Sequence, residues 1–204
     1  LIVTLVLQLI FCIFIPGTWT MLCKRLLLFI FFITSFTKAF SAIFVVTSNA
    51  DSGPGTLREA LTLAAANGSA TTDYINFNLA DQSATGRTIV LLSQLPDLSS
   101  NLIIDGTSQA GALFGQSDAR VKIATPDAYS AYPIRYIPMT IFNGENLDHV
   151  EIYGLYLYDY YDIIISYPDL KPRTGMSITG CSNITIGATG KGNLIRCFRN
   201  YTID

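Results

Sequence analysis

His149 and its neighbour Asp148 are the residues of this 204-residue chain that most directly suggest catalysis, because a carboxylate can orient a histidine acting as general base. A nucleophilic triad would also need an activated serine or cysteine, and the sequence contains no G-x-S-x-G turn. His149 is the only histidine of the chain. We therefore expect it to lie in a loop or at a strand edge, without a catalytic role.

Carboxylates gather in the same stretch of the chain, at Asp148, Glu151, Asp159 and Asp162. Such groups can act as acid and base on either side of a glycosidic bond, or bind calcium. These four do not recur at a regular spacing, and neither an Asp-Asp nor an Asn-Thr-Asp signature occurs. We expect ordinary surface acids here, with no catalytic residue, no metal site and no cofactor.

Tyrosines are concentrated directly after these first acids, at Tyr153, Tyr156, Tyr158, Tyr160 and Tyr161. The apolar residues between them suit a core, so we expect the first three to project outward, where exposed aromatic rings can stack on flat sugar rings. In the alternative interpretation, these rings pack beneath the 129–138 segment or stack on one another. Tyr153, Tyr156 and Tyr158 are thus candidate glycan-binding residues.

The charge distribution argues against a nucleic-acid partner. Residues 1–42 contain no acid and only Lys24, Arg25 and Lys38 as bases, which leaves ten bases against 15 acids in the remainder. Those bases are scattered, whereas a phosphate backbone requires a dense cationic surface. We expect no nucleic-acid binding.

An export signal is the expected role of residues 21–42. Lys24-Arg25 precede an apolar run over 26–33, and small residues surround Ser41 and Ala42, where cleavage would fall. We interpret residues 1–20 as over-extended translation ahead of Met21, or as an apolar leader. The alternative is a membrane anchor over 1–33, although both apolar runs are shorter than the roughly 20 residues of a span. Membrane contact is expected only through this leader.

One short helix is expected in the remaining chain. A strand at 43–47 and a turn-rich segment lead to Thr56, which lies three residues before Glu59 in a capping-box pattern. Apolar residues then follow at helical spacing over 57–66, and Asn67-Gly68 supply a stop. We therefore predict an N-terminal strand and capping helix over residues 43–70.

Residues 71–204 contain short apolar segments separated by turn residues and no further helix. The predicted strands are 74–77, 88–92, 101–105, 121–124, 139–142, 150–153, 155–158 and 163–165. Near the end, Ile178, Ile186, Ile195 and Ile203 recur so regularly that the three steps from Ile178 to Ile203 would close one coil. This spacing favours the coils of a right-handed parallel β-helix, an all-β solenoid, over the alternative of an antiparallel sandwich.

The two cysteines beyond the leader, Cys181 and Cys197, lie about two-thirds of such a coil apart. They would therefore occupy different walls of the solenoid, and a disulfide requires Cα atoms within about 7 Å. We expect two separate thiols. With a single histidine they also fail to form a closed zinc site.

The segment Ser48–Leu61, with Thr56-Leu-Arg-Glu-Ala60 at its centre, resembles the entry segment of bacterial surface β-helix proteins with a C-S-L-R-E-A-type motif. Gly55-Thr56 stand where the first two residues of that motif would lie. The likeness continues through Ile75–Asn78, Leu102–Gln109, Val150–Leu155 and Ile184–Gly187.

Related proteins, often from gliding Bacteroidetes, are typically large and secreted or surface-attached, and many end in a gliding-motility-associated or type IX secretion domain. The resemblance implies an exported, extracellular or outer-surface protein, of which this chain is an N-terminal fragment carrying the first coils. It also implies that the helix covers the open end of the coil stack, with Arg58 and Glu59 on a solvated face.

The expected function is that of a structural or adhesive module which contacts extracellular polysaccharide or surface components. The alternative is the N-terminal part of a polysaccharide lyase or glycoside hydrolase whose active site lies beyond residue 204.

Overall fold

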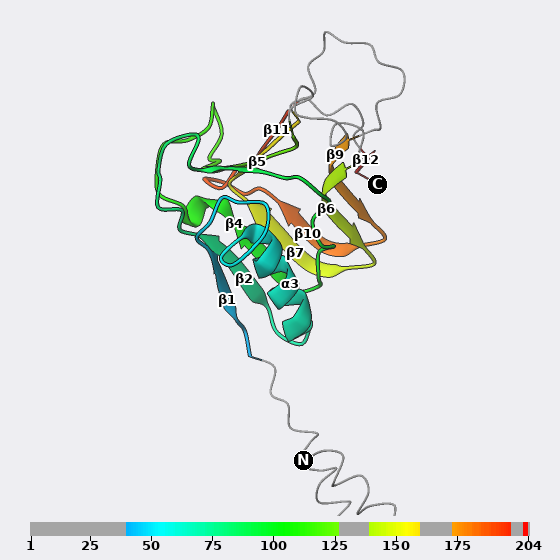
Figure 1. Ribbon diagram of the computed structural model, residues 1–204. Coiled ribbons are helices and arrows are strands. Elements are labelled where there is room, and N and C mark those ends of the chain that lie inside the picture. Colours follow the sequence, from blue (N-terminus) through cyan, green and yellow to red (C-terminus); the bar gives the residue numbers. More distant parts are fainter. Residues whose placement is uncertain (1–39, 127–138, 160–172, 197–201, 204) are drawn as a thin grey trace, which may run out of the picture. The chain divides into compact units, whose positions relative to one another are not determined.

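Parallel pairing between strands from successive stretches of the chain organises the computed structural model, which describes residues 40–126, 139–159, 173–196 and 202–203 (Figure 1). The backbone passes repeatedly through three sheets, and about four turns form a β-solenoid. Residues 1–39 of the predicted leader, the predicted strand 163–165, Tyr160, Tyr161, Asp162 and Cys197 lie outside the described residues.

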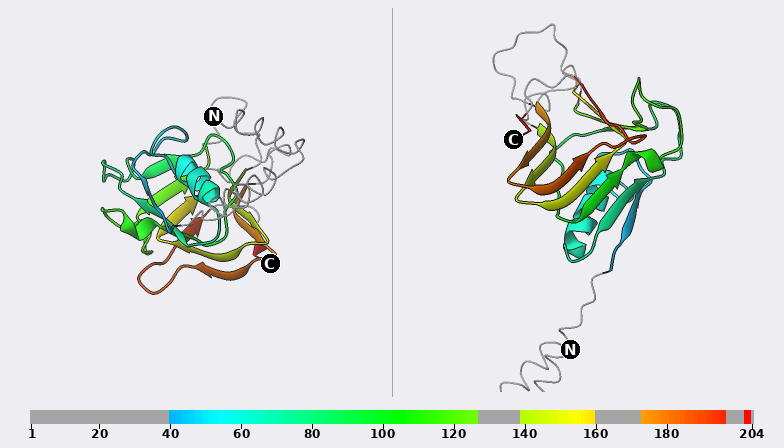
Figure 2. Two further views of the ribbon diagram at one scale, coloured as in Figure 1. Left: turned by 90° about the horizontal axis from the view of Figure 1, so that it is seen from below. Right: turned by 180° about the vertical axis from the view of Figure 1, so that it is seen from behind.

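Each sheet is built from strands of successive coils. The strand orders are β1-β2-β4-β7-β10, β11-β8-β5-β3 and β12-β9-β6, and Figure 2 shows strands of successive coils side by side. The bounds are β1 Ile43–Val46, β2 Asp73–Phe77, β3 Thr88–Val90, β4 Leu102–Asp105, β5 Val121–Ala124, β6 Met139–Glu145, β7 Asp148–Tyr153, β8 Leu155–Tyr158, β9 Arg173–Thr179, β10 Ser182–Ile186, β11 Leu194–Arg196 and β12 Thr202–Ile203.

All pairings between these strands are parallel, which excludes the antiparallel sandwich. The physical reason lies in the connections, because parallel neighbours must be joined by a long crossover rather than a two-residue hairpin. Passage through the other sheets supplies that crossover. The fold is therefore a mostly β solenoid with one α-helix, as the spacing of apolar segments predicts.

The coil predicted between Ile178 and Ile203 is confirmed. Ile178 on β9 pairs in register with Ile203 on β12, and Ile186 and Ile195 lie on the two strands between them. The preceding coil is longer, since Ile178 also pairs with Gly144 on β6, which is further from it in the sequence than Ile203 is. Coil length varies because the extra residues lie in the connections, while the strands keep their register.

The core consists of inward-facing side chains stacked from coil to coil. In the second sheet, Ile89, Ile123 and Leu157 are register partners, and all three are buried. In the first sheet, Ile75, Ile104 and Ile152 form an equivalent buried row. Burial of each such side chain contributes roughly 1.5–3 kcal/mol, so these rows hold the coils in register.

The single α-helix of the described residues, α3, spans Leu57–Asn67. Thr56 caps it by accepting a hydrogen bond from the Glu59 backbone N–H, as predicted. Glu59 Oε2 accepts at 2.6 Å from the Gly55 backbone N–H, one residue before the usual capping-box partner. Gly68, whose φ is 86°, caps the C-terminal end of the helix. The helix is not long and apolar enough to cross a bilayer.

The apolar face of α3 covers the first coil. Leu57, Ala60, Leu61 and Ala64 are buried in the same core as the residues of β1 and β2. Asp73 at the start of β2 is buried and fastens the end of the helix, because its carboxylate accepts hydrogen bonds from Asn67 Nδ2 at 2.8 and 3.1 Å. The helix therefore shares the core of the first two strands.

Three residues with left-handed backbone conformation (positive φ) stack in a ladder at the start of strands β4, β7 and β10 of the first sheet. Asn101, His149 and Asn183 occupy equivalent register positions and have φ of 56°, 56° and 55°. Asn and His are among the non-glycine residues that adopt this conformation most readily. His149 Nδ1 lies 3.0 Å from Asn101 Oδ1, so the ladder is also linked through side chains.

Two glycines allow close backbone approach at the corner after β4 and β7. Gly154 has a φ of 62°, and a Cβ there would lie 2.6 Å from the Thr107 backbone nitrogen. Gly106 faces it, with a Cβ position only 2.3 Å from the Gly154 carbonyl oxygen. Any side chain at this corner would push successive coils apart.

Candidate functional site

The outer face of the sheet β11-β8-β5-β3 presents two rows of side chains that cross the strands. Thr88, Lys122, Tyr156 and Leu194 are register partners in one row. Val90, Ala124, Tyr158 and Arg196 form the next row, two residues further along each strand. Side chains alternate between faces of a strand, so both rows point away from the buried Ile89, Ile123 and Leu157.

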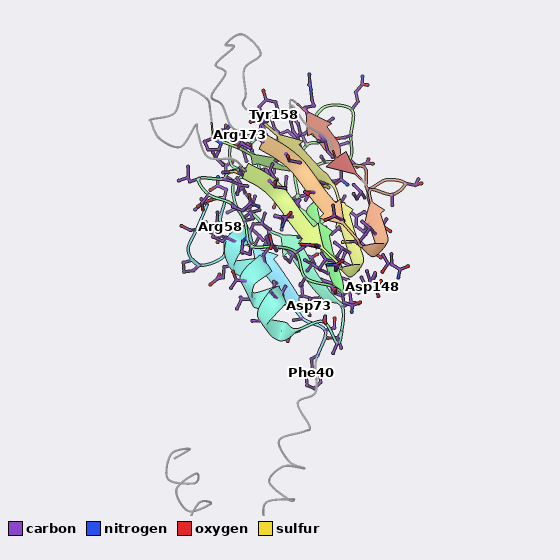
Figure 3. All side chains as sticks on the ribbon, turned by 90° about the vertical axis from the view of Figure 1, so that its right-hand side faces the viewer. Phe40, Arg58, Asp73, Asp148, Tyr158 and Arg173 are labelled. Carbon is purple, nitrogen blue, oxygen red and sulfur yellow. The ribbon has the colours of Figure 1, made fainter. Side chains whose placement is uncertain are left out.

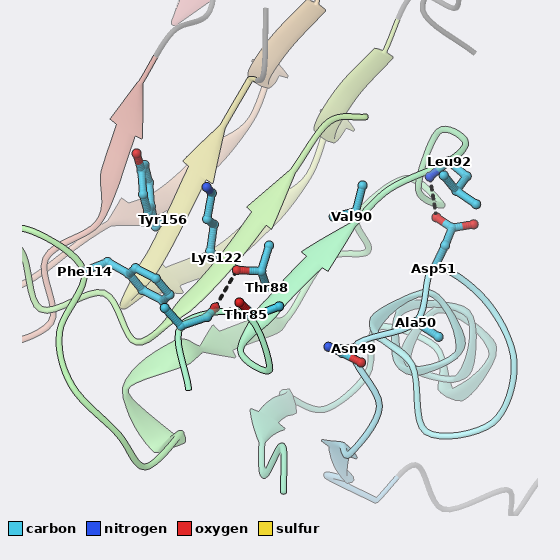
Figure 4. Close-up of a pocket in the computed structure, with 11 residues that line it drawn as sticks. Asn49, Ala50, Asp51, Thr85, Thr88, Val90, Leu92, Phe114, Lys122 and Tyr156 are labelled. Carbon is cyan, nitrogen blue, oxygen red and sulfur yellow. Dashed lines mark hydrogen bonds between the residues drawn. The ribbon is translucent and has the colours of Figure 1, made fainter. Parts of the chain in front are cut away.

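A groove of about 620 Å³ lies over the first of these rows (Figure 4). Figure 4 shows Lys122 and Tyr156 projecting from neighbouring strands, with Phe114 next to them and Asn49, Ala50 and Asp51 on the opposite side. The lining residues are Asn49, Ala50, Asp51, Ala84, Thr85, Thr88, Val90, Leu92, Phe114, Lys122 and Tyr156. The groove therefore combines aromatic rings, hydroxyl groups and one lysine.

Aromatic rings and the lysine form a continuous cluster. The ring centroids of Phe114 and Tyr156 are 5.7 Å apart, and those of Tyr156 and Tyr158 are 5.5 Å apart in an edge-on arrangement. Lys122 Nζ lies 4.0 Å from the Tyr158 centroid and 5.3 Å from that of Tyr156. These distances suit cation–π attraction, which holds the ammonium group against the ring faces.

The ring of Phe114 contacts a buried cation, Arg87. The Arg87 guanidinium lies 4.7 Å from the Phe114 ring centroid and donates hydrogen bonds to the carbonyl oxygens of Gln82 and Arg120. Burial, and then the charge of Arg120, lower the pKa of Arg87 from its ordinary value. An arginine remains charged even so, which adds a second positive group beneath this end of the groove.

Arg58 holds Asp51, which lines the side of the groove opposite Tyr156. Arg58 is therefore not on the solvated face that we expected. Its side chain, labelled in Figure 3, is only 19% exposed. It donates to Asp51 Oδ1 at 2.6 Å and to the carbonyl oxygens of Ser93 and Gln94 at 3.0 and 2.5 Å. Asp51 also accepts from the Leu92 backbone N–H at 3.0 Å. Arg58 thus links the loop that contains Asp51 to the segment after β3. Glu59 is exposed, as expected.

The three candidate tyrosines do not lie together. Tyr156 and Tyr158 lie on the outer face of β8, whereas Tyr153 ends β7 in a different sheet and is 9% exposed. Lys191 Nζ lies 4.9 Å from the Tyr153 ring centroid, and the Tyr153 hydroxyl donates to Glu151 at 2.7 Å. Desolvation, this hydrogen bond and nearby negative charges raise the pKa of Tyr153 to about 12.

The predicted acids are also dispersed. Asp148 accepts hydrogen bonds from Ser182 and Asn183, which lower its pKa, and Glu151 Oε1 lies 3.2 Å from His149 Nε2. Asp159 is no surface acid, because its carboxylate is 2% exposed. No group of three potential metal-ligating side chains occurs in the described part of the chain.

Asp159 forms a buried ion pair with Arg173, whose Nη1 lies 3.2 Å away. Arg173 Nη1 also donates to the Pro126 carbonyl oxygen at 2.9 Å and to Thr125 Oγ1 at 3.1 Å, and Thr125 donates to Asp159. The network joins the segments that follow β5 and β8 to the start of β9. It therefore links two sheets of the solenoid.

Cys181 is a free thiol that packs against the core, and its sulfur accepts a hydrogen bond from the Leu147 backbone N–H at 3.2 Å. The expectation of separate thiols stays a prediction for Cys197.

Sequence reasoning missed Lys122, Thr88, Phe114 and Arg196 as members of this surface. A signal for two of them exists, because Thr88, Lys122 and Tyr156 follow one another at equal intervals along the chain. That interval is the length of each of the two coils that separate these residues, and it places the three side chains next to one another. Phe114 lies in a loop and has no such signal.

Comparison with protein-family models, curated proteins and solved structures gives no match for this chain. The class is therefore defined by geometry alone. The chain is a β-solenoid of about four turns with a helix packed on its first coil.

Proposed function

We propose that this chain is an exported cell-surface or secreted β-helix module that binds extracellular polysaccharide along the outer face of the sheet β11-β8-β5-β3. We further propose that its coils are right-handed, because crossover connections between parallel strands adopt that hand almost without exception. Lys24-Arg25, the apolar run over 26–33 and the small residues before Ile43 support export.

The observation that carries the binding proposal is the composition of the groove. A sugar ring has an apolar face and a polar rim, and Tyr156 and Phe114 offer ring surfaces beside the hydroxyl groups of Thr85 and Thr88. Ligand sites typically combine such apolar walls with a few fixed polar groups. Because the groove runs over neighbouring coils, it suits a polymer better than a single sugar.

The test is binding of the full-length protein to a set of soluble polysaccharides, measured by isothermal titration calorimetry. Replacing Tyr156 by leucine keeps apolar bulk but removes the aromatic face, and we expect at least a tenfold loss of affinity. The matched control is Tyr74→Leu on the outer face of β2, in another sheet. The proposal fails if no polysaccharide binds, or if both variants lose affinity equally.

Export is tested separately by N-terminal sequencing of protein recovered from the medium or the cell surface. We expect the mature protein to begin directly after Ser41 or Ala42. A recovered chain that retains residues 1–33 would contradict the export signal and favour an anchor.

The same incubations test the enzymatic alternative. Release of unsaturated or reducing sugar ends by the wild-type protein would replace a binding function with that of a lyase or hydrolase.

A further inference from the structure

The sheet β11-β8-β5-β3 ends at β3, and the first coil adds no strand beyond it. β1 of the first coil pairs with β2 in another sheet. Within the continuously described stretch 40–126, no strand pairs with the far side of β3. The loop residues Asn49, Ala50 and Asp51 line the groove instead. The groove therefore lies beside an open strand edge.

This open edge presents the backbone groups of Val90. Leu91 donates to the carbonyl oxygen of Ala124 on β5 at 2.8 Å, so the backbone N–H of Leu91 faces the neighbouring strand. Successive residues of a strand direct their backbone groups to opposite edges, so the N–H and C=O of Val90 face away from β5. Val90 is 37% exposed and lines the groove. Neither of its backbone groups forms a hydrogen bond among the described residues.

The N–H groups on either side of Val90 along this edge are already bound. The Leu92 N–H donates to the Asp51 carboxylate at 3.0 Å (Figure 4), and the Thr88 N–H donates to the Thr85 carbonyl oxygen at 3.0 Å. An added polypeptide strand would need alternate residues along the edge, and here it finds both groups open at one residue only. The edge suits a ligand that carries one donor next to one acceptor.

The chain itself shows how such a backbone pair is bound. The Gln94 side-chain amide accepts from the Thr140 N–H at 2.7 Å and donates to the Thr140 carbonyl oxygen at 2.5 Å, on the end strand β6. Gln109 binds the N–H and C=O of Leu79 in the same way, at 2.6 and 3.1 Å. In both cases one group with an adjacent donor and acceptor satisfies the N–H and C=O of a single residue.

Resting on the proposed polysaccharide binding, we infer that the Val90 backbone binds two neighbouring hydroxyl groups of a sugar ring, and that the ligand is a polysaccharide in which such a pair is unsubstituted. One hydroxyl donates to the Val90 carbonyl oxygen and the other accepts from its N–H, since a hydroxyl group can do either. A few fixed polar groups of this kind give a ligand site its specificity.

The first experiment uses xylohexaose, cellohexaose and mannohexaose, each compared with the same oligosaccharide after methylation of its neighbouring hydroxyl pair. Methylation removes the donors and keeps the sugar ring. Titration calorimetry is done on the full-length protein, and any other glycan that binds is compared with its methylated form in the same way. We expect the unmodified form to bind at least tenfold more tightly.

The two proposals can fail separately in this experiment. If no glycan binds, the proposed function fails. If a glycan binds equally well after methylation, or if only glycans without an unsubstituted pair bind, the present inference alone fails.

A backbone variant locates the effect. Val90→Pro removes the N–H at an edge where proline is tolerated, and we expect about a three- to tenfold loss of affinity, the size of one net hydrogen bond. Val90→Thr keeps the backbone groups and should change affinity by less than about twofold. The matched control is Val45→Pro on the end strand β1, where the carbonyl oxygen of Val46 faces β2 and the backbone of Val45 faces the open edge. Circular dichroism must show that each variant is folded. Equal losses in the two proline variants would overturn the inference.

Amide hydrogen exchange of the wild-type protein, measured by NMR, tests the same contact without a variant. Saturation with the tightest-binding of the unmodified glycans should slow exchange of the Val90 N–H at least tenfold and leave that of Val45 unchanged. Unchanged exchange at Val90 in the saturated complex would overturn the inference. Equally tight binding of a hexathreonine peptide would assign the edge to strand addition and overturn it as well.

Discussion

Loss of the buried cation Arg173 is expected to cost more stability than loss of any partly exposed cation. Arg173 and Asp159 are 3% and 2% exposed and lie 3.2 Å apart, within a network that includes Thr125 and Pro126. Arg173→Met keeps the length of the side chain but leaves the Asp159 carboxylate buried without this cation. Breaking a buried pair in this way costs about 3–5 kcal/mol.

That cost is large against a typical total stability of about 5–15 kcal/mol. With a urea dependence of about 1–3 kcal/mol per molar, a loss of 3 kcal/mol lowers the unfolding midpoint by roughly 1–3 M. The assay is urea unfolding of the full-length protein followed by far-UV circular dichroism. The matched control, Lys191→Met, breaks the pair with Asp105, but Lys191 is 43% exposed, so we expect a loss below about 1 kcal/mol.

The double variant Asp159→Leu with Arg173→Met completes the cycle. It removes both charges together, so we expect it to be more stable than the sum of the two single losses by at least about 2 kcal/mol. The reasoning is refuted if Arg173→Met shifts the midpoint no more than Lys191→Met. It is also refuted if the double variant shows simple additivity.

Three further outcomes follow from backbone geometry and charge. Gly154→Ala should lower the free energy of unfolding by about 1–3 kcal/mol, measured in urea, because φ is 62° and a Cβ would meet the Thr107 backbone. A neutral effect would contradict the close approach of the two backbones. His149 has a φ of 56°, which asparagine adopts readily and a β-branched residue does not. We therefore expect His149→Asn to keep the melting temperature and His149→Val to lower it. Equal melting temperatures of the two variants would contradict a conformational role for this position. The pKa of Asp148 is lowered in the fold by hydrogen bonds from its neighbours, so its contribution to stability is present above the ordinary value of 3.8 and is lost as the pH falls below it. Asp148→Asn should therefore reduce the acid dependence of the melting temperature below about pH 4, and an unchanged acid profile would contradict this assignment.

The sequence by itself determined the elements and the kind of stack that they build. Thr56, Glu59 and Gly68 act through backbone groups within a few residues, so the helix ends could be predicted locally. Ile178 and Ile203 could be paired because the last coil has short connections and a visible period. Such signals depend on residues close in sequence or on regular spacing.

Only the tertiary structure decided which side chains share a surface. Tyr153 and Tyr156 are close in sequence, yet the corner at Gly154 sends them into different sheets. Lys122 and Tyr156 are a whole coil apart in sequence, yet coil stacking makes them neighbours. The spacing visible in the last coil does not predict this pairing, because the earlier coils are longer and register between coils is set by burial of the core rows rather than by any local rule. The burial of Asp159 and the contacts of Arg58 were decided by the same long-range packing.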